Sequence, residues 1–415
     1  MSKTPLFLLF FTLLHGFSPS SSEPYLGVNY GELADNLPPP ASTAHLLQST
    51  VFSNLRLYNA DPAVISAFSG TGISLLLGVS NSDIPSLAGD PSAAAAWVST
   101  NLLPFLPSTS ISAVSVGNEV LNSGDSSLSS LLLPAMQNLH AAIAAAPSAA
   151  SVKVSTVHSM AVLSQSDPPS AGAFHSDLAA TLQPILQFLR DNNSPFMINP
   201  YPYFAYRSDP RPETLTFCLF QPGPARYDPG SGIPYTNMFD AQVDAIRAAL
   251  RAAGFAGQEV VVAETGWPYK GDDNEVGASV ENARAYNGNL VAHLRAMTEP
   301  VATYIFAMYD EDLKPGPTSE RSFGLFRPDL TPTYDAGLIN SGSGLGGSSS
   351  PVAPGETSKP EEVCVTSTGG TCSRPAVEYL PSAAVGRFVN IFGISLLFGF
   401  ASVFGVELMV MMHRD

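Results

Sequence analysis

Charged residues are scarce in this chain of 415 residues, and basic residues are the scarcest. Only 13% of the residues are charged, and 19 lysines and arginines stand against 35 aspartates and glutamates, which gives a net charge of −16. Because nucleic-acid binding depends on clustered basic side chains that displace counterions, this balance argues against a nucleic-acid partner and favours a neutral ligand. The hydrophobic content of 45% is too high for a disordered chain, so we expect a folded protein.

Cysteine is also rare, with three residues in the whole chain. This number is too small for a disulfide scaffold, although Cys364 and Cys372 lie close enough in sequence to pair; Cys218 is predicted to be a small buried apolar residue. His158 has no second His or Cys at metal-ligand spacing, which favours a structural, hydrogen-bonded histidine. We therefore expect neither a metal site nor a cofactor.

The two ends of the chain resemble routing signals. Residues 1–22 combine Lys3, an apolar run over residues 6–14 and a short run of serines, which predicts a removed signal peptide. The apolar run is too short for a transmembrane anchor, which needs about 20 residues. The Asn192 sequon fits a secreted chain, but Pro195 directly after it disfavours glycosylation.

The C-terminal part changes composition abruptly. Residues 341–387 form a Gly/Ser/Pro-rich linker with a short cysteine-containing segment, and residues 388–415 form a hydrophobic tail. This tail is predicted to be a glycosylphosphatidylinositol (GPI) signal or, alternatively, a single-pass anchor. Glu407 and the charged end at residues 413–415 disagree with a typical GPI signal. Either arrangement would tether the preceding domain to the outer face of the plasma membrane.

Residues 23–340 alternate short β-branched runs with longer Ala- and Leu-rich stretches, which is typical of βα units in one domain. The predicted strands are 26–30, 54–59, 74–79, 111–119, 152–159, 195–202, 259–267 and 302–311. The clearest helices are predicted at 91–105, 128–146, 236–254 and 279–297, the third with Gly254 as its C′ residue. Eight such units predict a (β/α)8 TIM barrel. An open doubly wound sheet is the alternative, but no glycine-rich phosphate loop follows the first strand.

In such a barrel the chemistry gathers at the carboxyl ends of the strands, and the polar residues there have a common character. Aromatic rings suit the apolar faces of sugars, while amide, hydroxyl and carboxylate groups match sugar hydroxyls. The polar strand-end residues are Asn29, Tyr30, Arg56, Tyr58, Asn59, Asn118, Glu119, His158, Asn199, Tyr201, Tyr203, Glu264, Trp267, Tyr309, Asp310 and Glu311. This set predicts a sugar-binding groove.

Two glutamates, Glu119 and Glu264, directly follow apolar strands. Glycoside hydrolysis needs such a pair, because one carboxylic acid protonates the leaving oxygen while the other carboxylate attacks the anomeric carbon or activates water. A single glutamate at a strand end is more often a structural partner of a base. Two glutamates at the strand ends of one barrel favour a catalytic role.

These residues bring out a resemblance to the plant glycoside hydrolase family 17 enzymes, the endo-1,3-β-glucanases, over residues 25–340. The matching motifs are GVNYG at 27–31, LRLYNADPAV at 55–64, SVGNEV at 115–120, NPYPYFAY at 199–206, VVVAETGWP at 260–268 and SERSFGLFRPD at 319–329. The resemblance implies an extracellular, monomeric, retaining hydrolase that acts on 1,3-β-glucans of the cell wall. A mixed-linkage 1,3;1,4-β-glucanase and a wall-binding protein without turnover are the alternatives.

The resemblance also implies roles for individual residues. Glu119 is the expected acid/base, with its pKa raised by Glu264 and partial burial, and Glu264 is the expected nucleophile. The expected substrate-binding residues are Tyr30, Tyr58, Asn118, Asn199, Tyr201, Tyr203, Trp267, Glu311, Lys314 and Glu320. Asp310 and Asp312 depart from the asparagines that usually flank this glutamate.

Overall fold

The computed structural model describes residues 25–340, which comprise nearly all of the predicted catalytic domain. The predicted signal peptide, linker and tail, together with Cys364 and Cys372, lie outside the described residues.

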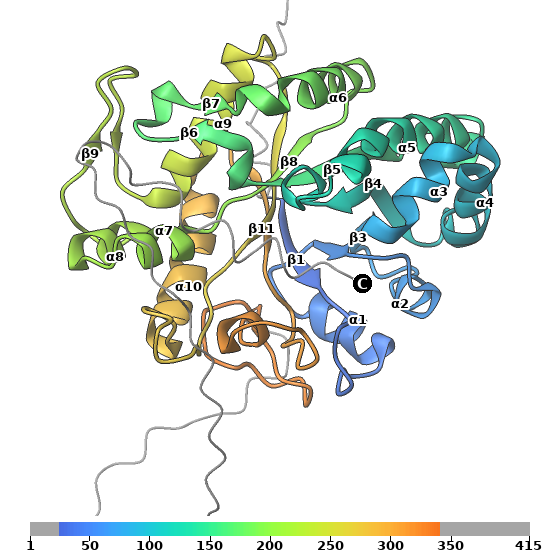
Figure 1. The fold of residues 1–415 in the computed structure, drawn as a ribbon. Coiled ribbons are helices and arrows are strands. Elements are labelled where there is room, and N and C mark those ends of the chain that lie inside the picture. Colours follow the sequence, from blue (N-terminus) through green and yellow to red (C-terminus); the bar gives the residue numbers. More distant parts are fainter. Residues whose placement is uncertain (1–24, 341–415) are drawn as a thin grey trace, which may run out of the picture. The chain divides into compact units, whose positions relative to one another are not determined.

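Eight parallel strands close into a barrel in the order β1-β12-β11-β8-β5-β4-β3-β2 (Figure 1). The sheet closes where β1 pairs with both β2 and β12, which confirms the predicted (β/α)8 barrel and excludes the open sheet. All eight strands lie within or beside their predicted ranges. They are β1 Leu26–Tyr30, β2 Asn54–Leu57, β3 Ser74–Val79, β4 Ser110–Asn118, β5 Lys153–Ser159, β8 Phe196–Asn199, β11 Val260–Thr265 and β12 Ala302–Ile305.

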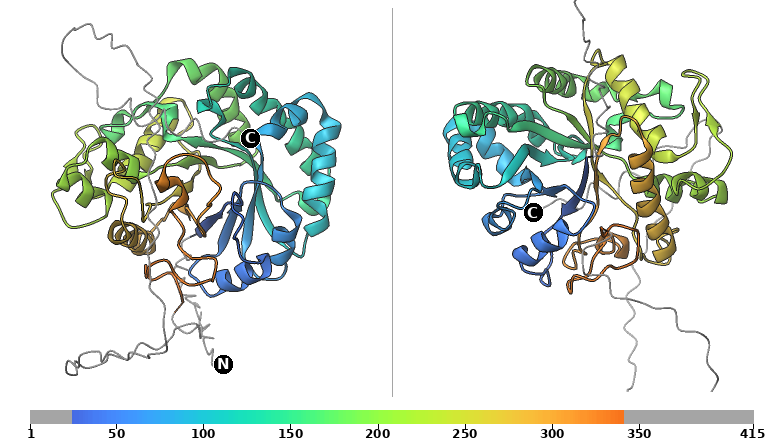
Figure 2. Two further views of the ribbon diagram at one scale, coloured as in Figure 1. Left: turned by 60° about the horizontal axis from the view of Figure 1, so that its bottom comes forward. Right: turned by 180° about the vertical axis from the view of Figure 1, so that it is seen from behind.

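The helices lie around the outside of the barrel (Figure 2). They are α1 Pro40–Gln48, α2 Pro62–Ala67, α3 Ile84–Gly89, α4 Pro91–Asn101, α5 Ser126–Ala144, α6 Ala179–Asp191, α7 Pro202–Ser208, α8 Pro212–Cys218, α9 Met238–Ala252 and α10 Val280–Ala296. Two small hairpins, β6 Leu163–Gln165 with β7 Ala173–Phe174 and β9 Arg226–Tyr227 with β10 Pro234–Tyr235, extend the loops after β5 and β8.

Helix α9 shows how local sequence sets the element boundaries. The Asn237 side chain caps its first turn by accepting a hydrogen bond from the Asp240 amide at 2.8 Å. Gly254 follows the last turn at a φ of +91°, a left-handed conformation that glycine adopts without steric cost, and this confirms the predicted C′ glycine. Cys218, at the end of α8, is buried as predicted.

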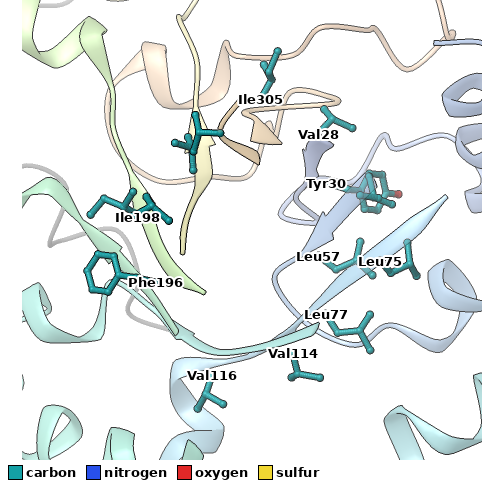
Figure 3. Close-up of a cluster of buried hydrophobic side chains, with 14 of the residues drawn as sticks. Val28, Tyr30, Leu57, Leu75, Leu77, Val114, Val116, Phe196, Ile198 and Ile305 are labelled. Carbon is teal, nitrogen blue, oxygen red and sulfur yellow. The ribbon is translucent and has the colours of Figure 1, made fainter. Parts of the chain in front are cut away.

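The strands bury both faces, and the side chains alternate between them. One face points into the barrel, where Ala113, Val157 and Ala263 belong to a small inner cluster. The other face packs beneath the helices in a large outer cluster that includes Val114 and Val116 (Figure 3). This alternation decides which strand-end residues can reach the barrel mouth.

His158 follows the inward-facing Val157 and lies in the outer layer, where its ring stacks on Phe196 with centroids 4.8 Å apart. Neither of its ring nitrogens has a hydrogen-bond partner among the described residues, so the predicted hydrogen-bonded histidine is wrong in that respect. The ring is held by apolar packing instead, and burial lowers the pKa of His158 to about 4. Among residues 25–340 there is also no cluster of His, Cys, Asp and Glu that could hold a metal ion.

We expect the protein to lose stability as the pH falls from about 6.5 to 4, in part through His158. The unfolded chain protonates this histidine below its ordinary pKa of 6.5, whereas the folded chain resists protonation down to about 4. The stability present above pH 6.5 is therefore lost across that window, by about 3 kcal/mol for this residue. Thermal unfolding at pH 7 and pH 4 should show a smaller loss for His158→Leu than for the wild type. Equal losses would contradict the assignment.

Candidate active site

Glu264 lies on β11 near its carboxyl end and is held by three side-chain donors. It is 4% exposed, and its Oε1 accepts hydrogen bonds from Arg56 Nη1 at 2.7 Å and from the Tyr58 hydroxyl at 2.8 Å. Its Oε2 accepts a hydrogen bond from the Tyr201 hydroxyl at 2.9 Å. The structure thus brings two predicted substrate-binding tyrosines onto the predicted nucleophile.

The partners of Glu264 keep it ionised. Burial by itself raises the pKa of a carboxyl group, but the nearby charges of Arg56 and Lys314 and the two tyrosine hydroxyls outweigh burial and lower the pKa of Glu264. A carboxylate that is ionised, buried and fixed by three donors has the state that a nucleophile needs.

Arg56 is one of the strand-end residues that predict the groove, but its contact with the predicted nucleophile was not predicted. It lies on β2, is 1% exposed, and joins three groups: Glu264, the backbone oxygen of Ala263 at 3.0 Å and Asn118 Oδ1 at 2.8 Å. A buried cation costs free energy unless it is paired, so this arginine and its partners form one unit. A single arginine inside the apolar strand NLRL was the signal that could have identified it.

Glu119 directly follows β4, where the backbone turns to a left-handed φ of +55°. Its amide donates to Val157 O at 2.8 Å, and its Oε1 accepts a hydrogen bond from Asn199 Nδ2 at 2.7 Å. Removal from water, and next the negative charge of Glu264, raise the pKa of Glu119 to about 8. The two glutamates therefore have their pKa values shifted in opposite directions, as a proton donor and a nucleophile require.

This difference predicts the pH dependence of turnover. Glu119 must be protonated and Glu264 ionised in the free enzyme, so kcat/KM should stay high through neutral pH and fall on the basic side near pH 8. With an activated aryl glucoside, whose leaving group needs little protonation, the basic limb should be much weaker. A basic limb near the ordinary carboxyl pKa of 4.5 would contradict the proposed state of Glu119.

Glu311, Lys314 and Glu320 lie together in the segment after β12. Lys314 Nζ is 3.7 Å from Glu311 Oε2 and 3.8 Å from Glu320 Oε2, and it lies 4.6 Å from the centroid of the Phe306 ring. Glu311 also accepts a hydrogen bond from the Leu33 amide at 3.1 Å. The charge of Lys314 contributes to the lowered pKa of Glu264, so this group acts electrostatically on the predicted nucleophile.

The two unusual aspartates join loops at the barrel mouth. Asp310 accepts hydrogen bonds from the Gly324 amide at 2.8 Å and from the Tyr269 hydroxyl. Asp312 accepts hydrogen bonds from the Asp35 amide and from Asn36 Nδ2, both at 3.2 Å. The loop after β12 is thereby tied to the loops after β1 and β11.

Three of the aromatic residues predicted to bind substrate are buried in the protein. Trp267 is 0% exposed and donates from Nε1 to Gly277 O at 2.8 Å, and Tyr203, also 0% exposed, packs against it with ring centroids 5.3 Å apart. Tyr30 belongs to the outer cluster, 6.0 Å from Tyr309 between ring centroids (Figure 3). These aromatic rings therefore support the walls of the site from behind.

Asn192 lies at the C-terminal cap of α6, where its Nδ2 donates to Phe188 O at 2.8 Å. Ser194, the third residue of the sequon, is 1% exposed. Asn192 precedes β8, so it lies toward the end of the barrel opposite the two glutamates.

A closed (β/α)8 barrel with two glutamates at the carboxyl ends of its strands, one with a raised and one with a lowered pKa, is the arrangement of a glycoside hydrolase. Residues 26–338 match the model of the glycosyl hydrolases family 17, and the chain belongs to that family.

Similar proteins support this assignment. The chain is 57% identical over 350 residues to glucan endo-1,3-beta-glucosidase 7 of Arabidopsis thaliana, covering 83% of this chain and 69% of the relative. It is 53% identical over 346 residues to glucan endo-1,3-beta-D-glucosidase of Olea europaea, covering 82% and 75%. Among solved structures, the β-1,3-glucanase and pollen allergen CJP38 of Cryptomeria japonica has a TM-score of 0.72 at 38% identity, covering 76% of this chain and 100% of the other.

Proposed function

We propose that this protein hydrolyses internal 1,3-β-glucosidic linkages of 1,3-β-glucans by a retaining, two-step mechanism. The observation that carries the proposal is the pairing of an ionised Glu264, held by Arg56, Tyr58 and Tyr201, with a protonated Glu119. The substrate class follows from the two relatives named as glucan endo-1,3-β-glucosidases, at 57% and 53% identity.

In the first step, a Glu264 oxygen attacks the anomeric carbon while Glu119 gives its proton to the departing glucosidic oxygen. The glucosidic bond breaks, and a covalent glucosyl ester forms on Glu264. This ester removes the negative charge that raised the pKa of Glu119, so Glu119 becomes a base. In the second step, Glu119 takes a proton from water, the water oxygen attacks the anomeric carbon, and Glu264 leaves as a carboxylate.

In this mechanism Asn118, Tyr58 and Tyr201 assist these steps. Asn118 shares Arg56 with Glu264 and has its backbone fixed by Asn81, whose Oδ1 accepts from the Asn118 amide at 2.9 Å. An amide fixed in this position suits a hydrogen bond to the 2-hydroxyl of the attacked sugar. Tyr58 and Tyr201 donate to the Glu264 carboxylate before attack, and their hydrogen bonds must weaken as its charge is lost.

Product analysis tests the substrate assignment. Laminarin should give a ladder of short 1,3-linked oligosaccharides, which indicates internal cleavage, while barley 1,3;1,4-β-glucan should be cut much more slowly. A preference for the barley glucan would support the mixed-linkage alternative. Binding to laminarin without product would support a wall-binding protein instead, and either outcome would overturn the proposal.

We further propose that the barrel acts outside the cell, attached to the plasma membrane through a GPI anchor added near the C-terminus. The support is the sequence of residues 1–22 and 388–415, which lie outside the described residues. Within residues 25–340, no helix combines the length and the apolar character needed to cross a membrane.

A phosphatidylinositol-specific phospholipase is expected to release the protein from plasma-membrane fractions, because anchor attachment removes the hydrophobic tail. An epitope placed after Met412 should be absent from the mature protein. Resistance to the enzyme together with retention of the epitope would favour the single-pass anchor and leave the glucanase assignment unaffected.

A further inference from the structure

Glu275 is a buried carboxylate that the catalytic steps above do not use. It lies in the loop between β11 and α10, eleven positions after Glu264 in the chain, and it is 4% exposed. We propose that Glu275 is a positioning residue: it holds the turn Thr318–Arg321 in place and thereby keeps the Lys314 ammonium beside the nucleophile. This inference rests on the proposed role of Glu264.

Glu275 collects donors from two loops. Its Oε2 accepts from the Ser319 amide at 2.9 Å and from the Asp272 amide at 3.0 Å, and its Oε1 accepts from the Ser319 hydroxyl. Arg207 of α7 lies 3.5 Å from Oε1. Multiple donors to one buried carboxylate define its position closely, since each would be left unsatisfied if the carboxylate moved.

The turn that Glu275 holds contacts Lys314 from two sides. Glu320, the residue after Ser319, places its Oε2 3.8 Å from Lys314 Nζ. Arg321 donates from Nη1 to the backbone oxygens of Lys314 at 2.9 Å and of Gly316 at 2.8 Å. The turn therefore fixes both the ammonium group and the backbone of this lysine.

The charge of Lys314 acts on Glu264 within a crowded set of groups. The titratable and charged groups facing Glu264 are Arg56 and Tyr58 from the β2 end, Glu119 from β4, Tyr201 after β8, and Lys314 and Glu320 after β12. Of these, Arg56 and Lys314 are the cations that favour the ionised carboxylate. Arg56 is anchored in the barrel, whereas Lys314 lies between Glu311, Glu320 and the Phe306 ring, and the Glu275 contacts act on it through the turn that carries Glu320.

Removing the Glu275 charge has two possible effects on Glu264, and they have opposite signs. If Glu275 acted only through space, loss of its negative charge would lower the pKa of Glu264 and move the acid limb of kcat/KM to lower pH. If Glu275 holds the turn, its loss lets Lys314 move away from Glu264. The pKa of Glu264 then rises and the acid limb moves to higher pH.

The test compares Glu275→Gln with Asp273→Asn, which removes one negative charge from an exposed position of the same loop. The acid limb of kcat/KM on laminarin is measured for both variants and for the wild type, with residual activity at neutral pH as a check on stability. We expect an upward shift of about 0.5 to 1 pH unit for Glu275→Gln and no shift for Asp273→Asn. Ser319→Ala, which removes one donor to Glu275, should shift the limb in the same direction by less.

A downward shift of the acid limb in Glu275→Gln would mean that Glu275 acts only as a charge through space. An unshifted limb with a lowered melting temperature would mean that Glu275 is only a structural residue. Either result would overturn the proposal. If Glu275→Gln does not fold, Ser319→Ala decides between the same outcomes. Wild-type hydrolysis of laminarin in the same assay separates this test from the proposed function, because a wild type without turnover would refute the function itself.

Discussion

Replacing Glu264 with alanine is expected to lower kcat on laminarin on the order of 10⁴-fold or more, because the covalent step loses its nucleophile. Added azide should restore turnover of an activated aryl glucoside and give a glucosyl azide of inverted configuration, since azide occupies the space of the missing carboxylate. Glu259→Ala, which removes an exposed glutamate just before the same strand, should keep wild-type activity.

The same variant has a structural consequence that can be measured separately. Arg56 loses its carboxylate but keeps Asn118 and the Ala263 carbonyl, so the fold should survive with a lower melting temperature. Removing one partner of a buried ion pair commonly costs about 3 to 5 kcal/mol. Circular dichroism at 25 °C should match the wild type. Near-normal laminarin hydrolysis by the folded variant would disprove the nucleophile assignment.

Replacing Glu119 with glutamine is expected to slow laminarin hydrolysis by about 10² to 10⁴-fold, because the sugar leaving group needs a proton from this residue. The first step with an activated aryl glucoside should change little, since its leaving group departs without protonation. The second step should be slow for both substrates, so the covalent intermediate should accumulate with the aryl glucoside, whose first step stays fast. Equal losses in the first step on both substrates would contradict the acid/base role.

The alternation of apolar strands with helices was enough to predict the barrel. Each strand is a short apolar run that ends in polar residues, and the closed topology follows from eight such runs joined by helices. The positions of Glu119 and Glu264 at one end of the barrel were predicted for the same reason, because parallel strands bring their carboxyl ends to one mouth. The positions of these two glutamates can therefore be predicted from where each strand ends in the sequence.

The sequence pattern could not show which face the side chains of some predicted site residues occupy. Tyr30 follows the inward-facing Asn29, whose Nδ2 donates to Ala263 O at 2.9 Å, so strand alternation turns Tyr30 outward. Trp267 lies in the loop after β11 and Tyr203 in the first turn of α7, beyond their strands, where alternation ends and only the packed structure shows that they are buried. Strand ends identified the site but could not distinguish its lining from its support.

The roles of Arg56 and Glu275 were not predicted because they depend on distant partners. Arg56 binds a carboxylate that lies 208 positions away in the sequence, and Glu275 binds a serine that lies 44 positions away. Sequence spacing cannot predict contacts between residues this far apart, because the chain between them forms other parts of the barrel. Arg56 could be recognised as an isolated charge in an apolar strand. The sequence around Glu275 has no comparable signal.

Trapping of the covalent intermediate tests the central claim most directly. The wild-type enzyme is incubated with an activated 2-deoxy-2-fluoro-laminaribioside, which slows both steps, and a good leaving group lets the first step proceed. Mass spectrometry of the digested protein is expected to show one glycosyl group attached to the peptide that contains Glu264. A label on another residue, or an unlabelled protein that still releases the leaving group in a single equivalent, would contradict Glu264 as the nucleophile of a retaining hydrolase.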